Sequence, residues 1–342
     1  MEAVFLQNLS MDEEHEIQKF LSSLRFCSVL QHPGWNRAIH KAKTVRYYLA
    51  RNDGRILCFA LIVEGFLEAK IAFGPCGTQA AVIADSVEKI VEHYNARGFA
   101  TLEIQLGMPI SQHSEEIEYA IGKKLPFSQK VSRENWTTMD VLLNREADTL
   151  LSSFSQNHRR SIAKAVKNGL QAVVLQDEAS VREFARLYDA MYRHRKQIPP
   201  FADSKAVFLE IYGLFQTELK GLFMGVFAQD SRMLGGACFT ICNNTIAYAF
   251  GCTATGKQLP VLHLAFFEAM KIAANHQVER MDMGGINLMV DESDQVFHIN
   301  RFKMGFNGLV VYYPKKMVFT LSAYKKLLLG IAKRLYYLWK KI

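Results

Sequence analysis

The spacing of apolar and polar positions changes along the chain, and each change marks an expected element. Residues 12–24 have the period of an amphipathic helix that opens with acidic side chains. Residues 45–50 and 56–63 are expected to form a strand pair around a turn at 51–54, followed by a third strand at 67–73. A helix over 80–96, ended by Gly98, and a strand over 101–106 come next. The segment 31–35 contains a proline and a glycine and is expected to be a loop.

The second half of the chain repeats this order. Helices are expected at 179–196, 205–219 and 261–274, and strands at 222–228, 233–242, 245–252 and 279–283. When residues 53–74 are shifted by 177 positions they align without a gap on residues 230–251, and seven of the 22 positions are identical. The pattern therefore predicts a duplicated domain. A basic helix ending at Asn168-Gly169 is expected between the halves.

Composition is that of a globular protein, because 49% of the 342 residues are hydrophobic and 22% are charged. The length leaves room for two domains. The first residues carry acids and no apolar core, and no window is apolar enough for a membrane span, so a cytoplasmic protein is expected. The six cysteines have no CxxC spacing, which favours buried reduced thiols over disulfides or zinc ligands.

Charge is concentrated at the C-terminus. The net charge is +8, and from Lys315 onward there are eight basic residues and no acidic one. The preceding residues hold 33 basic and 33 acidic side chains, so the body is not a general polyanion binder. On a helical wheel, residues 320–342 place the basic side chains on one half and apolar and aromatic ones on the other. This helix could lie on an anionic membrane surface, pack on the protein body, or contact RNA.

The segment 297–314 carries the strongest candidate chemistry. Phe302 and Lys303 precede Gly305 and Gly308, and an apolar run follows at 309–313. A lysine beside such a turn can direct a point charge at a phosphate or at a developing oxyanion. The alternative is a hairpin turn with an exposed lysine. The histidines lack ligand spacing, so no metal site is expected; they include His158, His263, His276 and His298.

Helices, a three-strand meander, a helix and a further strand occur twice. The chain also carries a series of short motifs, which are Gln31-x-x-x-Trp35, Arg159-x-x-Ile162-x-x-Ala165-x-Lys167-x-Gly169, Arg195, Tyr248 before Gly251, Met281-Asp282-x-Gly284-Gly285 and Arg301-Phe302-Lys303-x-x-Phe306. The element order and these motifs together resemble the Fem family of peptidoglycan-bridge aminoacyltransferases. It implies an α+β fold of two tandem GNAT-like domains with mixed sheets flanked by helices. The expected division is 1–150 for an acceptor-binding domain, 151–314 for a domain with the reacting face, and 315–342 for a basic amphipathic C-terminal helix.

The resemblance also implies an activity. A Fem-like enzyme moves an aminoacyl group from aminoacyl-tRNA to an amine of a UDP-linked or lipid-linked peptidoglycan precursor, with the tRNA as co-substrate and without a cofactor. The turn at 252–261 holds one glycine, and Pro260 removes an N–H donor, which argues against ordinary acetyl-CoA binding. Two alternatives are a GNAT-fold N-acyltransferase that modifies an envelope or lipid-linked saccharide with another acyl donor, and an inactive GNAT-like binding module. Membrane attachment would be peripheral, at the inner leaflet.

Eight residues form the expected site. Lys303 is assigned an electrostatic role, and the resemblance implies that the backbone near Phe302 positions the amine. Arg195 and Tyr248 are candidates for contacts with the phosphate and peptide of the acceptor. Asp282 resembles a catalytic base, although an acid before two glycines also caps turns. The expected substrate-binding set is completed by Gln31, Trp35 and Arg301.

Overall fold

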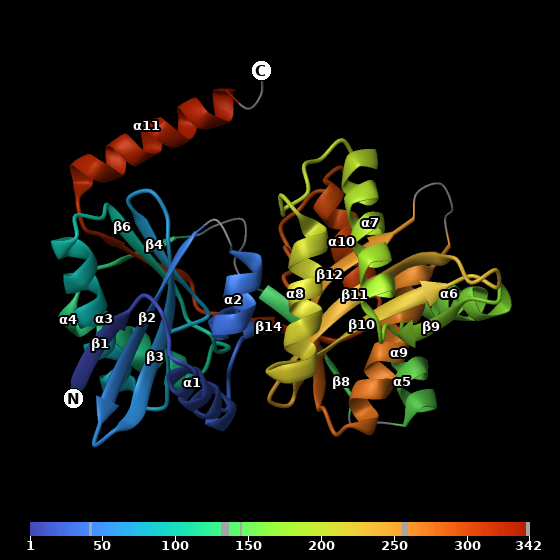
Figure 1. The fold of residues 1–342 in the computed structure, drawn as a ribbon, viewed down its shortest axis with the longest axis horizontal. Coiled ribbons are helices and arrows are strands. Elements are labelled where there is room, and N and C mark those ends of the chain that lie inside the picture. The colour runs from blue at the N-terminus through green and yellow to red at the C-terminus, as the bar shows by residue number, and fades with distance from the viewer. Residues whose placement is uncertain (41–42, 131–136, 144–145, 255–258, 340–342) are drawn as a thin grey trace. The chain divides into compact units, whose positions relative to one another are not determined.

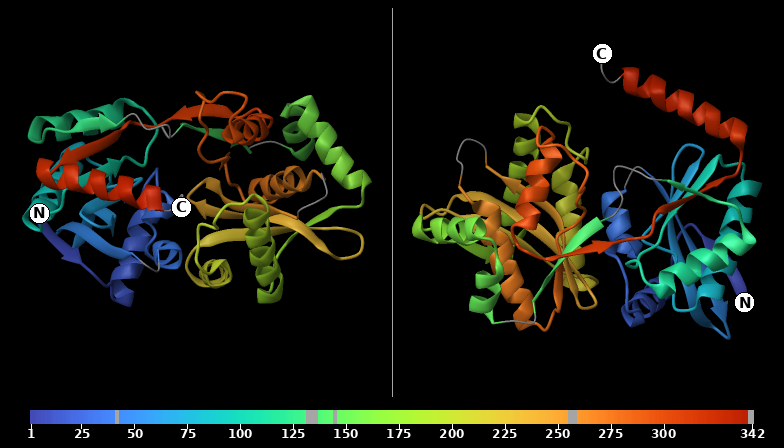
Figure 2. Two further views of the ribbon diagram at one scale, coloured as in Figure 1. Left: turned by 90° about the horizontal axis from the view of Figure 1, so that it is seen from above. Right: turned by 180° about the vertical axis from the view of Figure 1, so that it is seen from behind.

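The computed structural model describes residues 1–40, 43–130, 137–143, 146–254 and 259–339 (Figure 1). The chain divides into two compact units, one made of residues 1–136 and 312–342 and the other of residues 137–311. Each unit is built around its own mixed sheet, and helices cover both faces of each sheet (Figure 2). This is the α+β architecture that the sequence predicts.

The first unit begins as an alternation of strands and helices and is completed by the end of the chain. Its strand order is β1-β2-β3-β4-β6-β15-β7, with β5 paired to β3. All its pairs are antiparallel except β4 with β6. Its elements are β1 (Glu2–Leu6), α1 (Met11–Ser23), η1 (Val29–Gln31), α2 (Pro33–Ile39), β2 (Thr44–Asn52), β3 (Arg55–Glu64), β4 (Glu68–Ala72), β5 (Cys76–Gly77), α3 (Ala80–Ala96), β6 (Thr101–Gln105), α4 (Gln112–Lys124), β7 (Ser128–Lys130), β15 (Lys316–Thr320) and α11 (Ala323–Trp339).

The second unit has the strand order β14-β8-β13-β12-β11-β10-β9, with β12 and β13 parallel. Helices α7 and α8 lie on one face of this sheet and α9 on the other (Figure 1). Its elements are β8 (Thr137–Leu142), α5 (Ala147–Ser153), α6 (Gln156–Lys167), β9 (Gln171–Val174), α7 (Glu178–His194), α8 (Ser204–Thr217), β10 (Lys220–Phe227), β11 (Met233–Cys242), β12 (Thr245–Thr253), α9 (Val261–Asn275), β13 (Arg280–Asp282), α10 (Gln295–Met304) and β14 (Leu309–Tyr312).

The two sheets have the same strand order, which confirms the predicted duplication of topology. The first sheet from β1 to β7 corresponds strand by strand to the second from β9 to β14. A shift of 177 positions places β3 and β4 within about one residue of the starts of β11 and β12. The β2–β3 turn has positive φ at Asp53 (49°) and Gly54 (77°), as a two-residue hairpin of the favoured twist requires.

The repeats exchange one strand, and this corrects the expected domain boundaries. Strand β8 lies within the expected first domain but pairs with β13, so it belongs to the second unit and the boundary falls at 136 rather than at 150. Strand β15 follows the second unit but pairs with β6 and β7, so the C-terminal segment is not a helix alone. The sixth strand of each sheet therefore comes from the other half of the chain.

Two local expectations were also wrong. The segment 31–35 is not a loop, because Pro33 starts helix α2 and His32 is its N-cap. Proline fits the first helical position, where its missing N–H costs no hydrogen bond. The residues before Gly305 form helix α10 rather than a hairpin turn.

The cores explain the helix placement. In the first unit one apolar cluster lies under α3 and α4, and another lies under α1. In the second unit α9 packs over the large cluster that includes Phe239 and Phe266.

All six cysteines are free thiols, and four of them are buried. Within the described part of the chain, no helix has the length and hydrophobicity that crossing a bilayer requires.

Candidate active site

The site begins where β13 ends. Asp282 is the last residue of this strand, and Gly284 after it has a φ of +74°, which favours glycine. Asp282 Oδ1 accepts a 2.7 Å hydrogen bond from the Gly284 N–H and another from the hydroxyl of Thr138. The turn-capping alternative for Asp282 is thus confirmed. The same contacts fix the position of its carboxylate.

Lys303 occupies the last turn of α10, and its side chain points inward. The residue is only 7% exposed, and its Nζ donates a 2.7 Å hydrogen bond to the carbonyl oxygen of Gly285. The alternative of an exposed lysine in a hairpin turn is therefore wrong. Burial lowers the pKa of Lys303 to about 8, although the nearby Asp282 carboxylate opposes the shift. At neutral pH the side chain is still mainly a cation, and two of its three N–H donors remain for a ligand.

Two further predicted residues lie near this lysine. The Tyr248 ring centroid is 5.9 Å from Lys303 Nζ, and the ring packs against Phe239 and Phe266. Burial raises the pKa of the Tyr248 phenol, while the charge of Arg195 acts in the opposite direction. Arg195 is exposed at the C-cap of α7. The structure thus brings Lys303, Tyr248 and Asp282 together, with Arg195 in electrostatic range of the tyrosine.

An acidic residue that the sequence analysis missed faces Asp282. Asp140 in β8 is the register partner of Asp282 in β13, so the two side chains lie on the same face of the sheet. Burial and the Asp282 charge raise the pKa of Asp140 to about 6, and Arg280 opposes this with its Nε 3.5 Å from Asp140 Oδ2. The only signal in the sequence was a polar residue inside a short apolar strand.

Phe302 takes part through both its ring and its backbone. The ring packs against the core beside His263, Phe266 and Phe306. In a continuing helix the Phe302 carbonyl would accept from the Phe306 N–H, but that N–H bonds to the backbone carbonyl of Lys303 instead. It accepts a hydrogen bond from His158 Nε2 at 2.7 Å. This carbonyl oxygen has a second lone pair that could accept from a substrate amine. The expected role of the Phe302 backbone in positioning the amine stays a prediction.

Two neutral histidines support this turn. His158 is 6% exposed, and its ring centroid lies 4.5 Å from that of His263 and 4.6 Å from that of Phe306. Burial lowers the pKa of both imidazoles, to about 4 for His263. A Cβ on Gly305 would overlap the His158 ring, so glycine is required there for space. No group of three metal-ligating side chains occurs within the described residues.

The first unit holds two of the predicted ligand residues, Gln31 and Trp35, and both are buried. Gln31 is fully buried; its Nε2 donates to the Ala72 carbonyl at 2.7 Å and its Oε1 accepts from the Leu61 N–H at 2.8 Å. The two ends of this amide thus bridge β3 and β4, and the expected role of Gln31 in substrate binding stays a prediction. Trp35 is 2% exposed.

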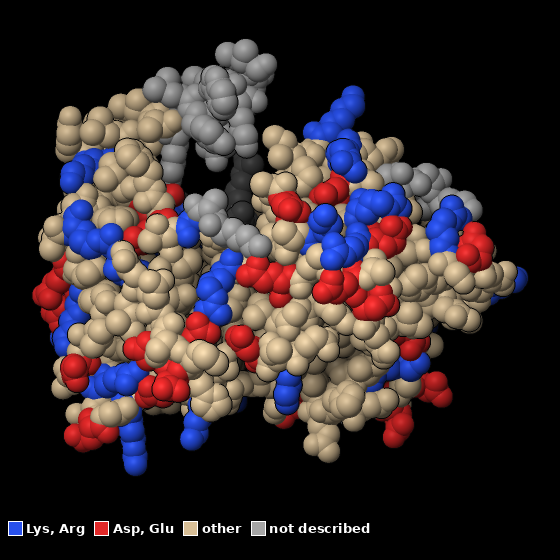
Figure 3. Space-filling view, in the orientation of Figure 1, with Lys and Arg blue, Asp and Glu red and all other residues tan. Residues whose placement is uncertain are grey.

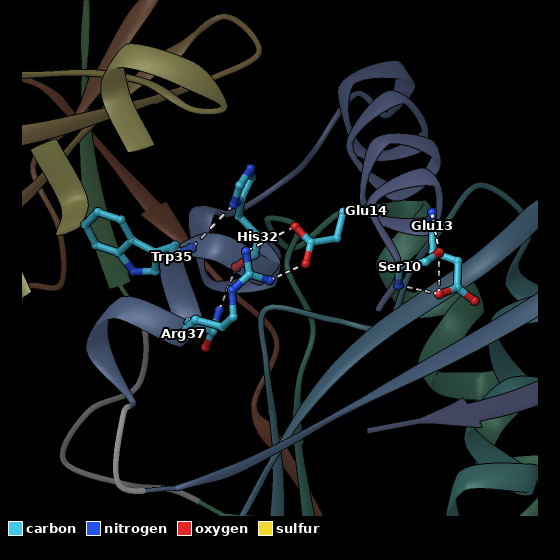
Figure 4. Close-up of polar contacts among 7 residues, drawn as sticks. Ser10, Glu13, Glu14, His32, Trp35 and Arg37 are labelled. Carbon is cyan, nitrogen blue, oxygen red and sulfur yellow. Dashed lines mark hydrogen bonds and ion pairs between the residues drawn. The ribbon is translucent and has the colours of Figure 1, made fainter. Parts of the chain in front are cut away.

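Helix α2 is held by polar contacts that Figure 4 shows. The Trp35 N–H donates to His32 Nδ1 at 3.4 Å, and Arg37 forms an ion pair with Glu14 of α1. Burial lowers the pKa of His32 to about 4. The remaining predicted ligand, Arg301, is exposed on α10 in the second unit. The structure therefore groups part of the predicted set in the second unit and places Gln31 and Trp35 in the first.

The start of α9 is the position where a CoA pyrophosphate would be expected. Residues 255–258 of the predicted turn lie outside the described residues. Pro260 is the N-cap of α9 and makes no side-chain cap, and the first helical N–H, that of Val261, bonds to the Leu259 carbonyl at 2.9 Å. Pro260 has no N–H and the Val261 N–H is already bonded, so neither backbone nitrogen can donate to an anion at this helix start.

No family model and no curated protein matches the chain. Among solved structures, FemX superimposes with a TM-score of 0.75 at 15% identity, covering 94% of this chain and 97% of FemX. The fold is that of FemX. A C-terminal domain of a lysylphosphatidylglycerol synthetase from Agrobacterium fabrum matches with a TM-score of 0.63 at 13% identity, covering 94% of this chain and 97% of the domain.

A third structure supports the tandem organisation of this FemX-like fold. A tandem GNAT protein from the clavulanic acid biosynthesis pathway matches with a TM-score of 0.55 at 12% identity, covering 94% of this chain and 99% of that protein. The resemblance to the Fem fold and the prediction of two GNAT-like domains are confirmed by these matches. Identities this low establish the fold alone, so the reaction must be inferred from the site.

Proposed function

We propose that this protein is an acyltransferase that moves an aminoacyl group from aminoacyl-tRNA to an amine of a cell-envelope precursor. The observation that carries the proposal is the buried ammonium of Lys303, held by Gly285 and close to Asp282 and Tyr248. The proposal is also supported by the architecture, which FemX and the lysylphosphatidylglycerol synthetase domain share. The precursor proposed as acceptor is a UDP-linked or lipid-linked peptidoglycan intermediate.

The chemistry needs positioning and charge more than a nucleophilic side chain. The acceptor amine attacks the ester carbonyl carbon, a C–N bond forms, and the C–O bond to the tRNA ribose breaks. One proton passes from the amine to the leaving ribose oxygen, so the reaction balances without a cofactor. The carbonyl oxygen gains negative charge in the transition state, and we assign its stabilisation to Lys303. A buried cation is effective in this role because water competes less for it.

The other predicted residues receive contact roles in this proposal. Arg195 is exposed near Tyr248 and is suited to a phosphate of donor or acceptor. Tyr248 offers an aromatic face and a hydroxyl to the peptide portion. Arg301, on the helix that carries Lys303, is suited to the polyanionic tRNA.

The test is turnover by Lys303→Met with mixed aminoacyl-tRNAs and a panel of UDP-linked and lipid-linked muropeptides. We expect a loss on the order of 10²-fold or more in kcat, because one stabilising group for the oxyanion is removed. Lys205→Met, which removes an exposed charge from α8, is the matched control and should keep wild-type turnover. Wild-type turnover by Lys303→Met would refute the assignment.

The donor is tested separately by thermal shift. We expect stabilisation by aminoacyl-tRNA and none by acetyl-CoA, because Pro260 and the bonded Val261 N–H weaken the anion site at α9. Stabilisation by an acyl-CoA instead would favour an N-acyltransferase that acts on an envelope or lipid-linked saccharide. If no donor or acceptor binds, the inactive-module alternative gains support.

A further inference from the structure

Among the side chains that the structure describes, helix α11 contacts the first unit through one side. Lys325 Nζ donates a 2.7 Å hydrogen bond to the carbonyl of Gly98, which follows helix α3. Leu329 is 7% exposed, so it also lies on the attached side. These contacts fix the rotation of the helix about its axis. Figures 1 and 2 show α11 extending beyond the sheet from this attachment.

The opposite side of α11 presents an apolar stripe to solvent. Tyr324, Leu327, Leu328 and Ile331 follow the i, i+3, i+4, i+7 spacing of one helix face, and they are 71%, 64%, 42% and 48% exposed. Single exposed apolar side chains are ordinary, but a continuous stripe on one helix face indicates a surface that binds something. Where side chains are described, the face predicted to be apolar does not pack on the body.

Basic residues flank this stripe. Lys326 and Arg334 are exposed along one flank of it, where Lys326 Nζ bonds to Thr320 Oγ1 at 2.9 Å, and together with Leu327 and Ile331 they border a shallow depression along the helix. From Lys315 to the C-terminus the sequence has eight basic residues and no acidic one. Elsewhere basic and acidic side chains are interspersed, as the face of the molecule in Figure 3 shows. The apolar stripe therefore lies within a positively charged segment of an otherwise neutral chain.

We propose that α11 binds an anionic lipid surface, with the Tyr324–Ile331 stripe inserted among the acyl chains and the flanking cations on the headgroups. A helix of this kind gains from apolar burial and from attraction to anionic lipid together. Tyrosine is well suited to the headgroup depth. The inference does not depend on the reaction proposed for the second unit, but such binding brings the protein to lipid-linked acceptors.

Other occupants explain fewer of the observations. RNA would use the cations and leave the apolar stripe in water, because phosphate contacts give no role to leucine side chains. A second copy paired through the same stripe would bring two strongly basic segments together without any acid to compensate. Of these three occupants, the anionic lipid surface uses both the stripe and the charge.

The experiment is flotation of the full chain with phosphatidylcholine vesicles and with vesicles that also contain phosphatidylglycerol. We expect the wild type to float with the anionic vesicles at low salt and to bind neutral vesicles at least about tenfold more weakly, given about 1 kcal/mol for each cation near the surface. Leu327→Glu with Ile331→Glu should abolish flotation. Lys326→Glu with Arg334→Glu should lower the partition coefficient about tenfold or more on anionic vesicles alone.

Matched controls exclude general effects of the substitutions. Phe66→Glu changes an equally exposed apolar residue in the first unit, and Lys164→Glu with Lys167→Glu reverses two exposed charges on α6. All controls should float like the wild type, and all variants should keep a Tm close to that of the wild type, because the changed side chains are exposed and the Lys326 hydrogen bond to Thr320 lies at the surface. Absence of wild-type flotation at low salt would overturn the proposal. Two further results without vesicle binding would also overturn it. One is a monomer–dimer equilibrium that Leu327→Glu with Ile331→Glu abolishes. The other is tRNA binding that Lys326→Glu with Arg334→Glu abolishes.

Discussion

The imidazole of His158 donates from Nε2 to the carbonyl oxygen of Phe302 over 2.7 Å. This contact joins the start of the second unit to the last turn of α10, one residue before Lys303. Because a carbonyl can only accept, Nε2 carries the proton, and Nδ1 is left to accept from Ser155 Oγ at 3.3 Å. His158 is therefore a neutral donor that holds the backbone next to the proposed oxyanion-stabilising lysine.

His158→Phe is expected to destabilise the protein by about 1–3 kcal/mol, because it keeps a ring of similar shape but leaves the Phe302 carbonyl without its donor. Urea denaturation at neutral pH measures the change. His276→Phe alters an exposed histidine and should shift the free energy of unfolding by less than about 0.5 kcal/mol. Equal stability of His158→Phe and wild type would show that the carbonyl finds another partner.

Lys303→Met should be more stable than the wild type at pH 7 by about 1–3 kcal/mol. The folded pKa of about 8 lies below the ordinary lysine pKa of 10.5, so the fold bears the cost of burying the ammonium at neutral pH. As pH rises from 8 to 10.5 the folded protein loses this proton before the unfolded chain does, and wild-type stability increases. Lys303→Met lacks this increase, so its advantage should shrink between pH 8 and 10.5 in denaturant melts.

The control for this experiment is Lys205→Met, which should follow the wild-type pH profile because Lys205 is exposed. A constant stability difference between wild type and Lys303→Met from pH 7 to pH 10.5 would mean that the lysine titrates normally. In that case its charge would be solvated, and the electrostatic role in the proposed reaction would lose its physical basis.

The sequence predicted the repeated strands and singled out Lys303, but it did not reveal the surroundings of that lysine. The pairing of Asp140 with Asp282 joins strands from opposite halves of the chain, and no local pattern encodes such a contact. Helix α10 was missed because the glycines near its end suggested a turn. The backbone partners of Gln31 could not be read from the sequence either, because a polar residue in a short motif does not show what its amide will bond to.

Asp140→Asn is expected to stabilise the protein at pH 7 by up to about 3 kcal/mol, because a folded pKa of about 6 against 3.8 means that the buried carboxylate is costly when ionised. The loss of the ion pair with Arg280 reduces this gain. The stability advantage of Asp140→Asn over the wild type should shrink as pH falls from 6 towards 3.8, because the Asp140 carboxyl of the folded wild type then takes up its proton. Asp53→Asn, in the exposed β2–β3 turn, is the control and should match the wild type at each pH. An advantage of Asp140→Asn that persists at pH 4 would contradict this assignment.

Glu64→Gln should destabilise the first unit by on the order of 3 kcal/mol, because it breaks a buried charge network. Glu64 is 8% exposed and accepts from Arg46 Nε and Tyr94 Oη, each at 2.8 Å, and from Arg97. Burial alone would raise the pKa of Glu64, but these hydrogen bonds lower it to about 2.

The sign of the pH dependence follows from that shift. The stability that Glu64 contributes is present above its unfolded pKa of 4.5 and is lost as pH falls towards 2. Glu64→Gln should therefore flatten this part of the acid unfolding curve. Glu88→Gln removes one of the acidic partners of Lys124 in a half-exposed ion pair, and it should cost less than about 1 kcal/mol. If both variants lost equal stability, the network would contribute no more than a surface pair.

The exchange of strands between the repeats makes the C-terminal segment essential for the first unit, and truncations should show it. A chain ending at Pro314 lacks β15, whose Met317 and Phe319 pair with Ile104 and Leu102 and are at most 2% exposed. Its loss separates β6 from β7 and opens the core between them. A chain ending at Ser322 keeps β15 and removes only α11, which buries Leu329 alone among its described apolar side chains.

We expect hydrogen exchange to show wild-type protection of β2 and β3 in the chain ending at Ser322. The chain ending at Pro314 should lose that protection while β11 and β12 of the second unit keep theirs. Retained protection of β2 and β3 in the shorter chain would show that the first sheet is stable without its exchanged strand.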